Sequence, residues 1–271
     1  MNTFFTIAAV AVAAAVTLPA HAQEPLWELG AVGGLAVTPA YPGSENRSRR
    51  ALLLPSFIYR GEVFRADQGG IGARLVKRER VEFDVGIAAS LPANSKDVAA
   101  RAGMPNLGPL VELGPRLRIT LAQLTPSSRV RLDLPLRAVL EARDGLRAQG
   151  FTFEPKLGYE MRGPQGAWSF EANLGMVVGD RKINRYFYEV RPAFATPLRP
   201  AFDADPGLML VRTGVSGSRR LNGDVRLYGF VRLDSYAAAA NRDSPLLKRD
   251  TGVSAGVGFA WTLMRSATLA K

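Results

Sequence analysis

The chain of 271 residues contains no cysteine and a single histidine, His21. Without cysteine it can build no disulfide framework, zinc ribbon or thiol nucleophile. Once His21 is removed, it can build no Ser-His-Asp triad and no H-E-x-x-H zinc site either. Acidic side chains are also in the minority, with 24 Asp and Glu against 35 Lys and Arg, so the net charge is +11. We therefore expect no enzyme, no cofactor and no metal ion.

A long apolar run is missing too. The longest, residues 7–18, is shorter than the roughly 20 residues that a membrane-spanning helix needs. It leads to Ala20-His21-Ala22, the small-residue pattern of a signal-peptide cleavage site. We expect cleavage after Ala22, which removes His21 and leaves 23–271 as a single exported domain. For an exported chain, the positive charge does not indicate nucleic acid as a partner.

The rest of the chain alternates between apolar and polar residues. Every even position from Val130 to Leu140 is apolar, whereas the odd positions between them include Arg131, Asp133 and Arg137. Successive side chains of a strand point to opposite faces, so each such strand has one apolar and one charged face. The alternating segments are longer than typical globular strands, and a bilayer-crossing strand needs about 9 to 11 residues. The pattern favours an all-β, antiparallel transmembrane barrel over a soluble β-sandwich.

We predict twelve strands, an even number, as is the rule for single-chain outer-membrane barrels, with ten or fourteen as alternatives. With both termini in the periplasm, this count places 38–50, 197–207 and 237–250 outside the cell. It places 91–110 and 179–185 in the periplasm. The predicted strands are 27–37, 51–60, 68–76, 80–90, 111–123, 128–141, 150–162, 166–178, 186–196, 208–219, 223–236 and 251–263.

The polar strand faces are expected to line the lumen. Arginine opposite Glu or Asp on neighbouring strands favours a structural ion-pair lining, with a selectivity filter as the alternative. Arg47, Arg49 and Arg50 would lie in the first external loop, where they can contact lipopolysaccharide phosphates. The predicted lumen charges are Arg116, Arg118, Arg129, Arg131, Arg137, Glu154, Glu160, Arg226 and Arg232.

Short motifs between Trp27 and Leu263 resemble, in their order and spacing, the MipA/OmpV family of outer-membrane proteins, named for the MltA-interacting protein. The family pattern usually has Asp in a G-M-P-D-L stretch, where this chain has Asn106. The motifs are W-E-L-G at 27–30, Y-P-G-S at 41–44, L-P-S-F-I-Y-R-G at 54–61, R-A-G-M-P-N-L at 101–107, E-L-G-P at 112–115, L-P-L-R at 134–137, G-D-R-K-I-N-R-Y-F-Y at 179–188 and R-D-S-P-L at 242–246.

The resemblance implies a barrel in the outer membrane of a Gram-negative-type cell, in contact with lipid and lipopolysaccharide. It also implies a non-enzymatic scaffold that links a lytic transglycosylase to a murein synthase in peptidoglycan turnover. Two alternatives stay open: a passive porin-like channel for small, preferentially anionic solutes, and a structural barrel without a specific partner. The family-motif or partner-contact candidates are Tyr41, Gly43, Ser44, Gly103, Met104, Pro105, Asn106, Gly179, Asp180, Arg181, Asn184, Tyr186, Asp243, Ser244 and Pro245.

Overall fold

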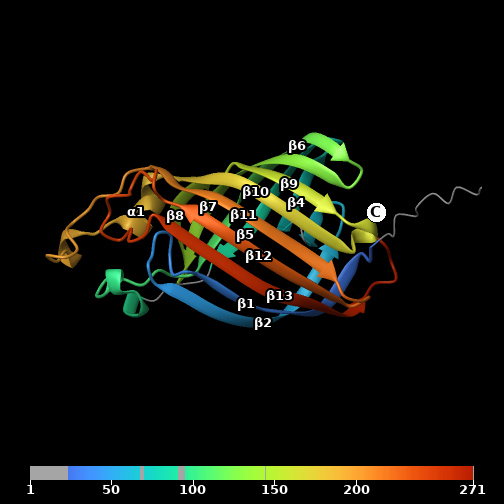
Figure 1. Ribbon diagram of the computed structural model, residues 1–271, viewed down its shortest axis with the longest axis horizontal. Coiled ribbons are helices and arrows are strands. Elements are labelled where there is room, and N and C mark those ends of the chain that lie inside the picture. The colour runs from blue at the N-terminus through green and yellow to red at the C-terminus, as the bar shows by residue number, and fades with distance from the viewer. Residues whose placement is uncertain (1–23, 68–69, 91–94, 144, 271) are drawn as a thin grey trace, which may run out of the picture.

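A computed structural model describes residues 24–67, 70–90, 95–143 and 145–270. The predicted signal peptide, 1–22, lies outside the described residues. The described residues form mainly antiparallel strands, with one α-helix, α1 (Arg181–Tyr188), near one end (Figure 1). Four 3-10 helices lie in the connections: η1 (Ser95–Asp97), η2 (Ala99–Arg101), η3 (Pro164–Gly166) and η4 (Pro192–Phe194). The strands are β1 (Trp27–Pro39), β2 (Arg47–Arg60), β3 (Phe64–Asp67), β4 (Gly70–Lys77), β5 (Val81–Ser90), β6 (Leu110–Thr125), β7 (Ser128–Ala142), β8 (Leu146–Phe153), β9 (Lys156–Arg162), β10 (Trp168–Gly179), β11 (Gly207–Arg220), β12 (Val225–Ser235) and β13 (Thr251–Arg265).

The sheet closes into a barrel because β1 pairs with β2 on one side and with β13 on the other. β8 and β9 form one barrel strand interrupted at Glu154 and Pro155, since both pair with β7 and with β10. The thirteen sheet segments therefore make twelve barrel strands. The predicted fold class and strand number are confirmed.

One predicted strand is wrong and one strand was missed, and the two errors cancel in the count. The segment 186–196 is not a strand but the end of α1 and a loop. The strand predicted at 68–76 corresponds to β4, but the short strand β3, which forms a hairpin with it, was not predicted. The first error arose because Tyr186 and Tyr188 alternate with other residues as in a strand, whereas Asp180 caps a helix there by accepting a hydrogen bond from the Ile183 N–H at 2.9 Å.

The same two errors reversed the expected sides of several loops. Tracing the strands places every long connection, 40–46, 91–109, 180–206 and 236–250, at one end of the barrel, which we call the loop end. The opposite end, the turn end, carries short turns and the first and last described residues, 24 and 270 (Figure 1). The sequence analysis placed 91–110 and 179–185 in the periplasm and 38–50 and 237–250 outside the cell. All of these segments lie at the same end of the barrel, so that division is wrong. Outer-membrane barrels have short periplasmic turns and long extracellular loops, which assigns the turn end to the periplasm.

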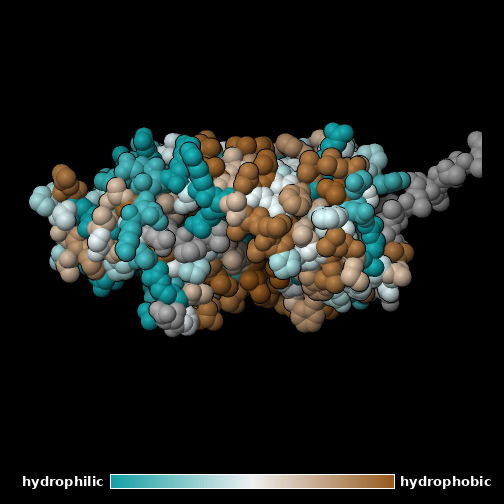
Figure 2. All heavy atoms as spheres, turned by 90° about the horizontal axis from the view of Figure 1, so that it is seen from below, coloured by the Kyte–Doolittle hydropathy of each residue, from teal (hydrophilic) through white to brown (hydrophobic). Residues whose placement is uncertain are grey.

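The outward face of the barrel is apolar. Leu53, Val257 and Leu174 are among its most exposed side chains, with 71%, 66% and 56% of their surface accessible. Figure 2 shows hydrophobic residues gathered over the middle of the molecule and hydrophilic residues concentrated at its ends. Such a band is the lipid-facing surface of a transmembrane barrel. Within the described residues, no helix has the length and apolar character needed to cross a membrane.

Close strand contact at Gly114 gives a prediction about folding. A Cβ atom added there would lie 2.1 Å from the Leu136 carbonyl oxygen, below the 3.0 Å limit of real Cβ contacts. Gly114→Val is therefore expected to prevent barrel closure, read as loss of heat-modifiable gel mobility in membrane fractions. Gly229→Val is the matched control, because its nearest atom is 3.8 Å away. Normal folding of the Gly114 variant would contradict this account.

Candidate functional site

The barrel encloses a central cavity of about 1170 Å³. One wall of this cavity is charged, and it is formed mainly by the lumen faces of β6, β7, β9, β10, β11 and β12. Nine basic and six acidic side chains line it, so cations are in excess. They are Arg50, Arg116, Arg118, Arg131, Arg137, Lys156, Arg162, Arg212 and Arg232, with Glu112, Asp133, Glu154, Glu160, Glu171 and Asp234.

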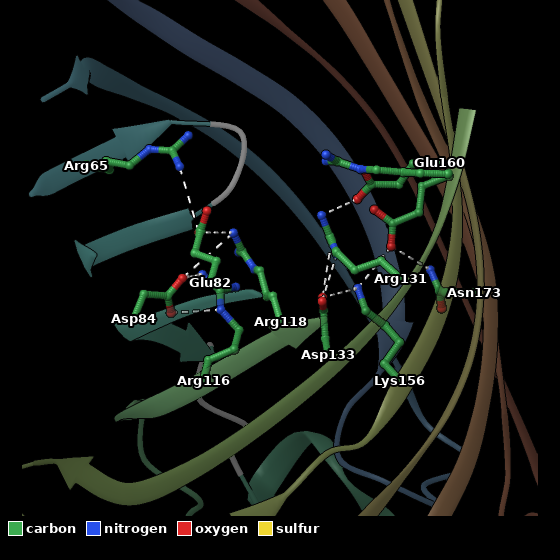
Figure 3. A network of polar contacts seen from close by, with 12 residues as sticks. Arg65, Glu82, Asp84, Arg116, Arg118, Arg131, Asp133, Lys156, Glu160 and Asn173 are labelled. Atoms are coloured by element: carbon green, nitrogen blue, oxygen red, sulfur yellow. Dashed lines mark hydrogen bonds and ion pairs between the residues drawn. The ribbon is translucent and has the colours of Figure 1, made fainter. Parts of the chain in front are cut away.

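A first ion-pair cluster joins β5 to β6 (Figure 3). Arg116 donates two hydrogen bonds to Asp84, at 2.9 and 2.8 Å. Arg118 donates to Glu82 at 2.9 Å and lies 3.7 Å from Asp84. Arg74 approaches Glu82 at 3.2 Å from β4. The sequence analysis identified the two arginines of β6 as lumen charges but not Glu82 and Asp84, which alternate with apolar residues in β5 and showed the same signal.

A second cluster spans β7, β9 and β10 (Figure 3). Arg131 pairs with Asp133 at 2.7 Å and also contacts Glu160. Arg129 binds the other side of Glu160 at 2.6 Å, and Lys156 binds Glu171 at 2.9 Å. The carboxylates of the cluster are thus each neutralised by at least one cation. Removing one partner of such a pair would leave an uncompensated charge, which is costly where the site is partly buried.

A third cluster lies nearer the loop end. Arg137 donates to Glu112 at 3.2 Å and lies 3.9 Å from Glu154. Across the lumen, Arg212 pairs with Asp234 at 2.7 Å. Of the predicted lumen charges not yet placed, Arg232 lies 3.5 Å from Asp234, and Arg226 donates to the Ser218 hydroxyl at 3.0 Å near the turn end.

The opposite wall of the cavity is apolar, which the sequence analysis did not predict. Val32 on β1, Leu52 and Leu54 on β2, and Phe230 on β12 line it. Leu52 and Leu54 are 47% and 51% accessible. The run Leu52-Leu53-Leu54 has no alternation, so its lumen-facing members cannot be told from its lipid-facing member by periodicity. The lumen is therefore amphipathic, with a charged wall facing an apolar one.

A smaller cavity of about 410 Å³ opens at the turn end, and we call it the vestibule. Ten basic side chains and three glutamates line it, so its charge is strongly positive. The charged residues are Arg60, Arg65, Arg74, Lys77, Arg78, Arg80, Arg118, Arg129, Arg131 and Arg162, with Glu24, Glu79 and Glu82.

The loops at the loop end pack together into a lid, which we define as residues 40–46, 95–109, 180–206 and 236–250. Two clusters of buried hydrophobic side chains hold it together. Tyr188 belongs to one cluster and Leu246 to the other, and both are fully buried, at 0% accessibility. Tyr41, Leu107 and Tyr236 also line the central cavity, so the lid roofs the lumen.

Hydrogen bonds join all four lid segments. Asn241 donates to the Asn184 side-chain oxygen at 2.9 Å, and both amides are almost completely buried. Ser244 donates to the Tyr188 carbonyl at 2.7 Å. Arg101 donates to the Phe187 carbonyl at 3.1 Å and lies 5.7 Å from the centre of the Tyr41 ring. The lid is therefore a built structure rather than a set of separate loops.

The structure brings the family-motif candidates together although they lie far apart in sequence. All fifteen fall within the lid or, for Gly179, at the end of β10 directly beneath it. Asn106, the departure from the family pattern, accepts a hydrogen bond from the Ser95 N–H at 2.7 Å through its side-chain oxygen, which a carboxylate could equally do. The motifs missed Asn241 and Arg199, and Arg101, the first residue of the motif at 101–107, was not among the candidates. The role of these residues in joining the loops depends on tertiary contact.

Because side chains alternate along β2, the three arginines proposed to contact lipopolysaccharide do not all face the same side of the barrel wall. Arg47 and Arg49 are exposed, opposite Pro39 and Val37 of β1. Arg50 instead lines the central cavity. Only the first two remain in position for lipid phosphates.

Buried tyrosine side chains in the lid predict that the lid opens at alkaline pH. Burial raises the pKa of Tyr41, and that of Tyr236, to about 12. The ordinary value is near 10, so their contribution to lid stability is complete below pH 10 and falls as pH rises through 12. Burial also raises the pKa of Tyr188. We expect phenolate absorbance and lid proteolysis to rise together above pH 10; a lid that opens near neutral pH would contradict this.

These features define the class of protein: a twelve-stranded, membrane-spanning β-barrel of the outer-membrane type, with an amphipathic lumen closed by a lid. The family model described as MltA-interacting protein MipA matches residues 29–263, and the chain belongs to this family. No curated relative matches the chain significantly. Among the described residues, no group of His, Cys, Asp and Glu side chains has the arrangement of a metal site.

Solved structures similar to this chain are membrane barrels of low identity. An outer membrane channel from Pseudomonas putida F1 is 12% identical, with a TM-score of 0.45 over 94% of this chain and 100% of that one. The NanC porin is 8% identical, with a TM-score of 0.40 over 88% and 100%. Outer membrane phospholipase A from Escherichia coli is 8% identical, with a TM-score of 0.34 over 89% and 94%. At such values their activities do not transfer to this chain.

Proposed function

We propose that the protein is a non-enzymatic, passive channel for small anionic solutes, with the lid covering its outer mouth. The observation that carries this proposal is the excess of cations among the residues that line the lumen, nine to six in the central cavity and ten to three in the vestibule, with Arg118, Arg131 and Arg162 counted in both. The carboxylates are held in ion pairs, so the surplus arginines and lysines set the field that a solute meets. A positive field concentrates anions and excludes cations.

Planar-bilayer recording of the purified full-length protein tests the proposal. We expect discrete conductance steps and a reversal potential on the anion side across a KCl gradient. Folding is checked independently by heat-modifiable gel mobility. A silent trace from folded protein, or a cation-selective one, would overturn the channel.

A second candidate is a scaffold for peptidoglycan enzymes, favoured by the family's description as an MltA-interacting protein. A lytic transglycosylase and a murein synthase would be its partners. We infer that such partners dock at the turn end, since the segments 95–109 and 180–206 belong to the lid at the opposite end. The turn end offers its short turns and the basic vestibule.

The sequence analysis placed 91–110 in the periplasm, where a change in this segment would disturb partner binding. With the docking site at the turn end, the opposite result is expected. Replacing 99–104 of the lid with a flexible linker is expected to leave binding of a purified MltA-type transglycosylase intact. Replacing the turn 221–224 is expected to weaken binding. Loss of binding only with the lid replacement would place the docking site at the loop end and reject the assignment made here.

A further inference from the structure

The vestibule at the turn end collects basic side chains from many strands into one small space. Its ten cations outnumber its three glutamates by seven. Nine of the ten are arginines, which bind phosphate and carboxylate groups through two parallel hydrogen bonds. They come from β2, β3, β4, the turn after β4, β6, β7 and β9, which follow one another around the sheet. The cations therefore line the inside of a curved wall.

The least exposed cations of the vestibule form its floor and are fixed by a shared carboxylate (Figure 3). Glu82 accepts a hydrogen bond from Arg118 at 2.9 Å and lies 3.2 Å from Arg74 and 3.9 Å from Arg65. These three arginine side chains are 10%, 14% and 27% accessible. One carboxylate shared in this way holds the guanidinium groups in a defined arrangement and leaves the floor positive.

Four further cations form the rim of the vestibule: Lys77, Arg78, Arg80 and Arg162. All four are exposed, and within the described ranges of the chain none of them forms an ion pair. The turn that carries the first three is anchored to β6, because the Thr120 N–H donates to the Arg80 carbonyl at 2.8 Å. The rim therefore presents charges without acidic partners from a turn that the barrel holds in place.

The size and charge of the vestibule together favour a small, highly charged ligand. Its volume of about 410 Å³ lies toward the lower end of small-molecule pockets, which span roughly 300 to 1,000 Å³. A folded partner does not fit inside such a space. An excess of seven positive charges is best matched by an anion that holds several negative charges in a small volume. A phosphate group supplies up to about two charges and three acceptor oxygens, more than a carboxylate.

We infer that the vestibule is a binding site for a small soluble anion that carries several phosphate groups and enters from the turn end. The rim cations attract the anion, and the arginines of the floor donate hydrogen bonds to its oxygens. The vestibule continues into the central cavity, since Arg118, Arg131 and Arg162 line both. A bound anion therefore obstructs the passage of monovalent anions. This obstruction rests on the proposed channel function, whereas the binding site does not.

Isothermal titration calorimetry of the folded full-length protein with tripolyphosphate tests the site. We expect saturable binding of one ion per chain, with an affinity that falls as salt rises. Replacing Lys77, Arg78 and Arg80 together by Gln is expected to weaken binding about tenfold, because three exposed charge contacts are lost. Absence of saturable binding by the parent protein would overturn the site.

A matched control removes an equal charge from the opposite end. Arg242, Lys248 and Arg249 are exposed in the lid, and their replacement by Gln should leave the affinity for tripolyphosphate unchanged. Equal weakening in both triple variants would show that total charge attracts the anion and would overturn the vestibule as its site. Citrate is expected to bind the parent at least about tenfold more weakly than tripolyphosphate, since it carries fewer charges. Equal affinity for citrate would overturn the phosphate class.

Phospholipid headgroups carry the same chemistry, and native mass spectrometry of the purified protein distinguishes this source. We expect the parent and the Gln variant of the rim to retain phosphatidylglycerol equally, and tripolyphosphate to displace none of it. Retention by the parent alone, with displacement by tripolyphosphate, would identify a lipid headgroup as the occupant and would overturn the soluble ligand.

Planar-bilayer recording tests the obstruction separately from the site. Because the chain contains no cysteine, Leu221→Cys at the turn end reports the orientation of inserted protein through an impermeant maleimide. Tripolyphosphate on the turn side is expected to halve the chloride conductance near its dissociation constant, whereas the lid side should need about tenfold more. Binding by a folded protein that does not conduct would support the site and reject the channel. Conductance without binding would overturn the site and leave the channel standing.

Discussion

Replacing Tyr188 and Leu246 by alanine is expected to raise the conductance of the barrel in planar bilayers several-fold. Both side chains are fully buried, one in each hydrophobic cluster of the lid. Truncating one large buried side chain costs roughly 3 kcal/mol, which shifts an opening equilibrium by about a hundredfold. Neither residue lies in a barrel strand, so the lumen itself should survive.

The control for the lid variant comes from the same loop. Leu198 is 90% accessible, so Leu198→Ala removes a leucine side chain without loosening the lid. Its conductance should equal that of the parent, and its lid should resist proteolysis equally. If the double variant becomes protease-sensitive without conducting better, the barrier to ions lies inside the lumen and not in the lid.

Reversing three exposed charges of the vestibule is expected to abolish the preference for anions. Lys77, Arg78 and Arg80 lie around the turn from β4 to β5. Changing all three to Glu reduces the excess of cations in the vestibule from seven to one. The reversal potential across a KCl gradient should move toward zero. Because exposed charges are screened over about 10 Å at 0.1 M salt, the difference from the parent should shrink as salt rises.

An equal change of net charge at the other end of the molecule provides the control. Arg242, Lys248 and Arg249 are exposed in the lid, and their replacement by Glu changes the total charge by the same amount. This variant should keep most of the anion preference. Equal shifts in both variants would show that the field of the whole protein decides selectivity, and not the vestibule.

The strands and their inward-facing charges could be predicted from the sequence because both depend on how neighbouring residues alternate. In β7, apolar and charged residues alternate, and this pattern alone assigns Leu132 and Leu134 to the lipid face and Arg131 and Asp133 to the lumen. Where alternation failed, the prediction failed. The run of three leucines in β2 does not alternate, so the apolar lumen wall could not be predicted from it. Tyr186 and Tyr188 of α1 are spaced as in a strand, so a strand was predicted there.

The lid was not predictable in the same way. Its motifs were visible as separate segments, but nothing local indicated that Tyr41, Arg101, Tyr188 and Ser244 would meet. The expected division of these segments between two sides of the membrane followed from one missed strand, β3. Missing one strand reverses the direction of every later crossing until a second error restores it, and the false strand at 186–196 was that second error.

The sequence by itself determined a closed, membrane-spanning barrel of a known family, in a chain with no cysteine and a single histidine. It could do so because strand periodicity and composition are properties of neighbouring residues. Only the tertiary structure decided that the four long loops form one lid and that the lumen has an apolar wall. These features depend on strand register, ring closure and contacts between residues far apart in the sequence, such as Tyr41 and Leu246, which are 205 positions apart.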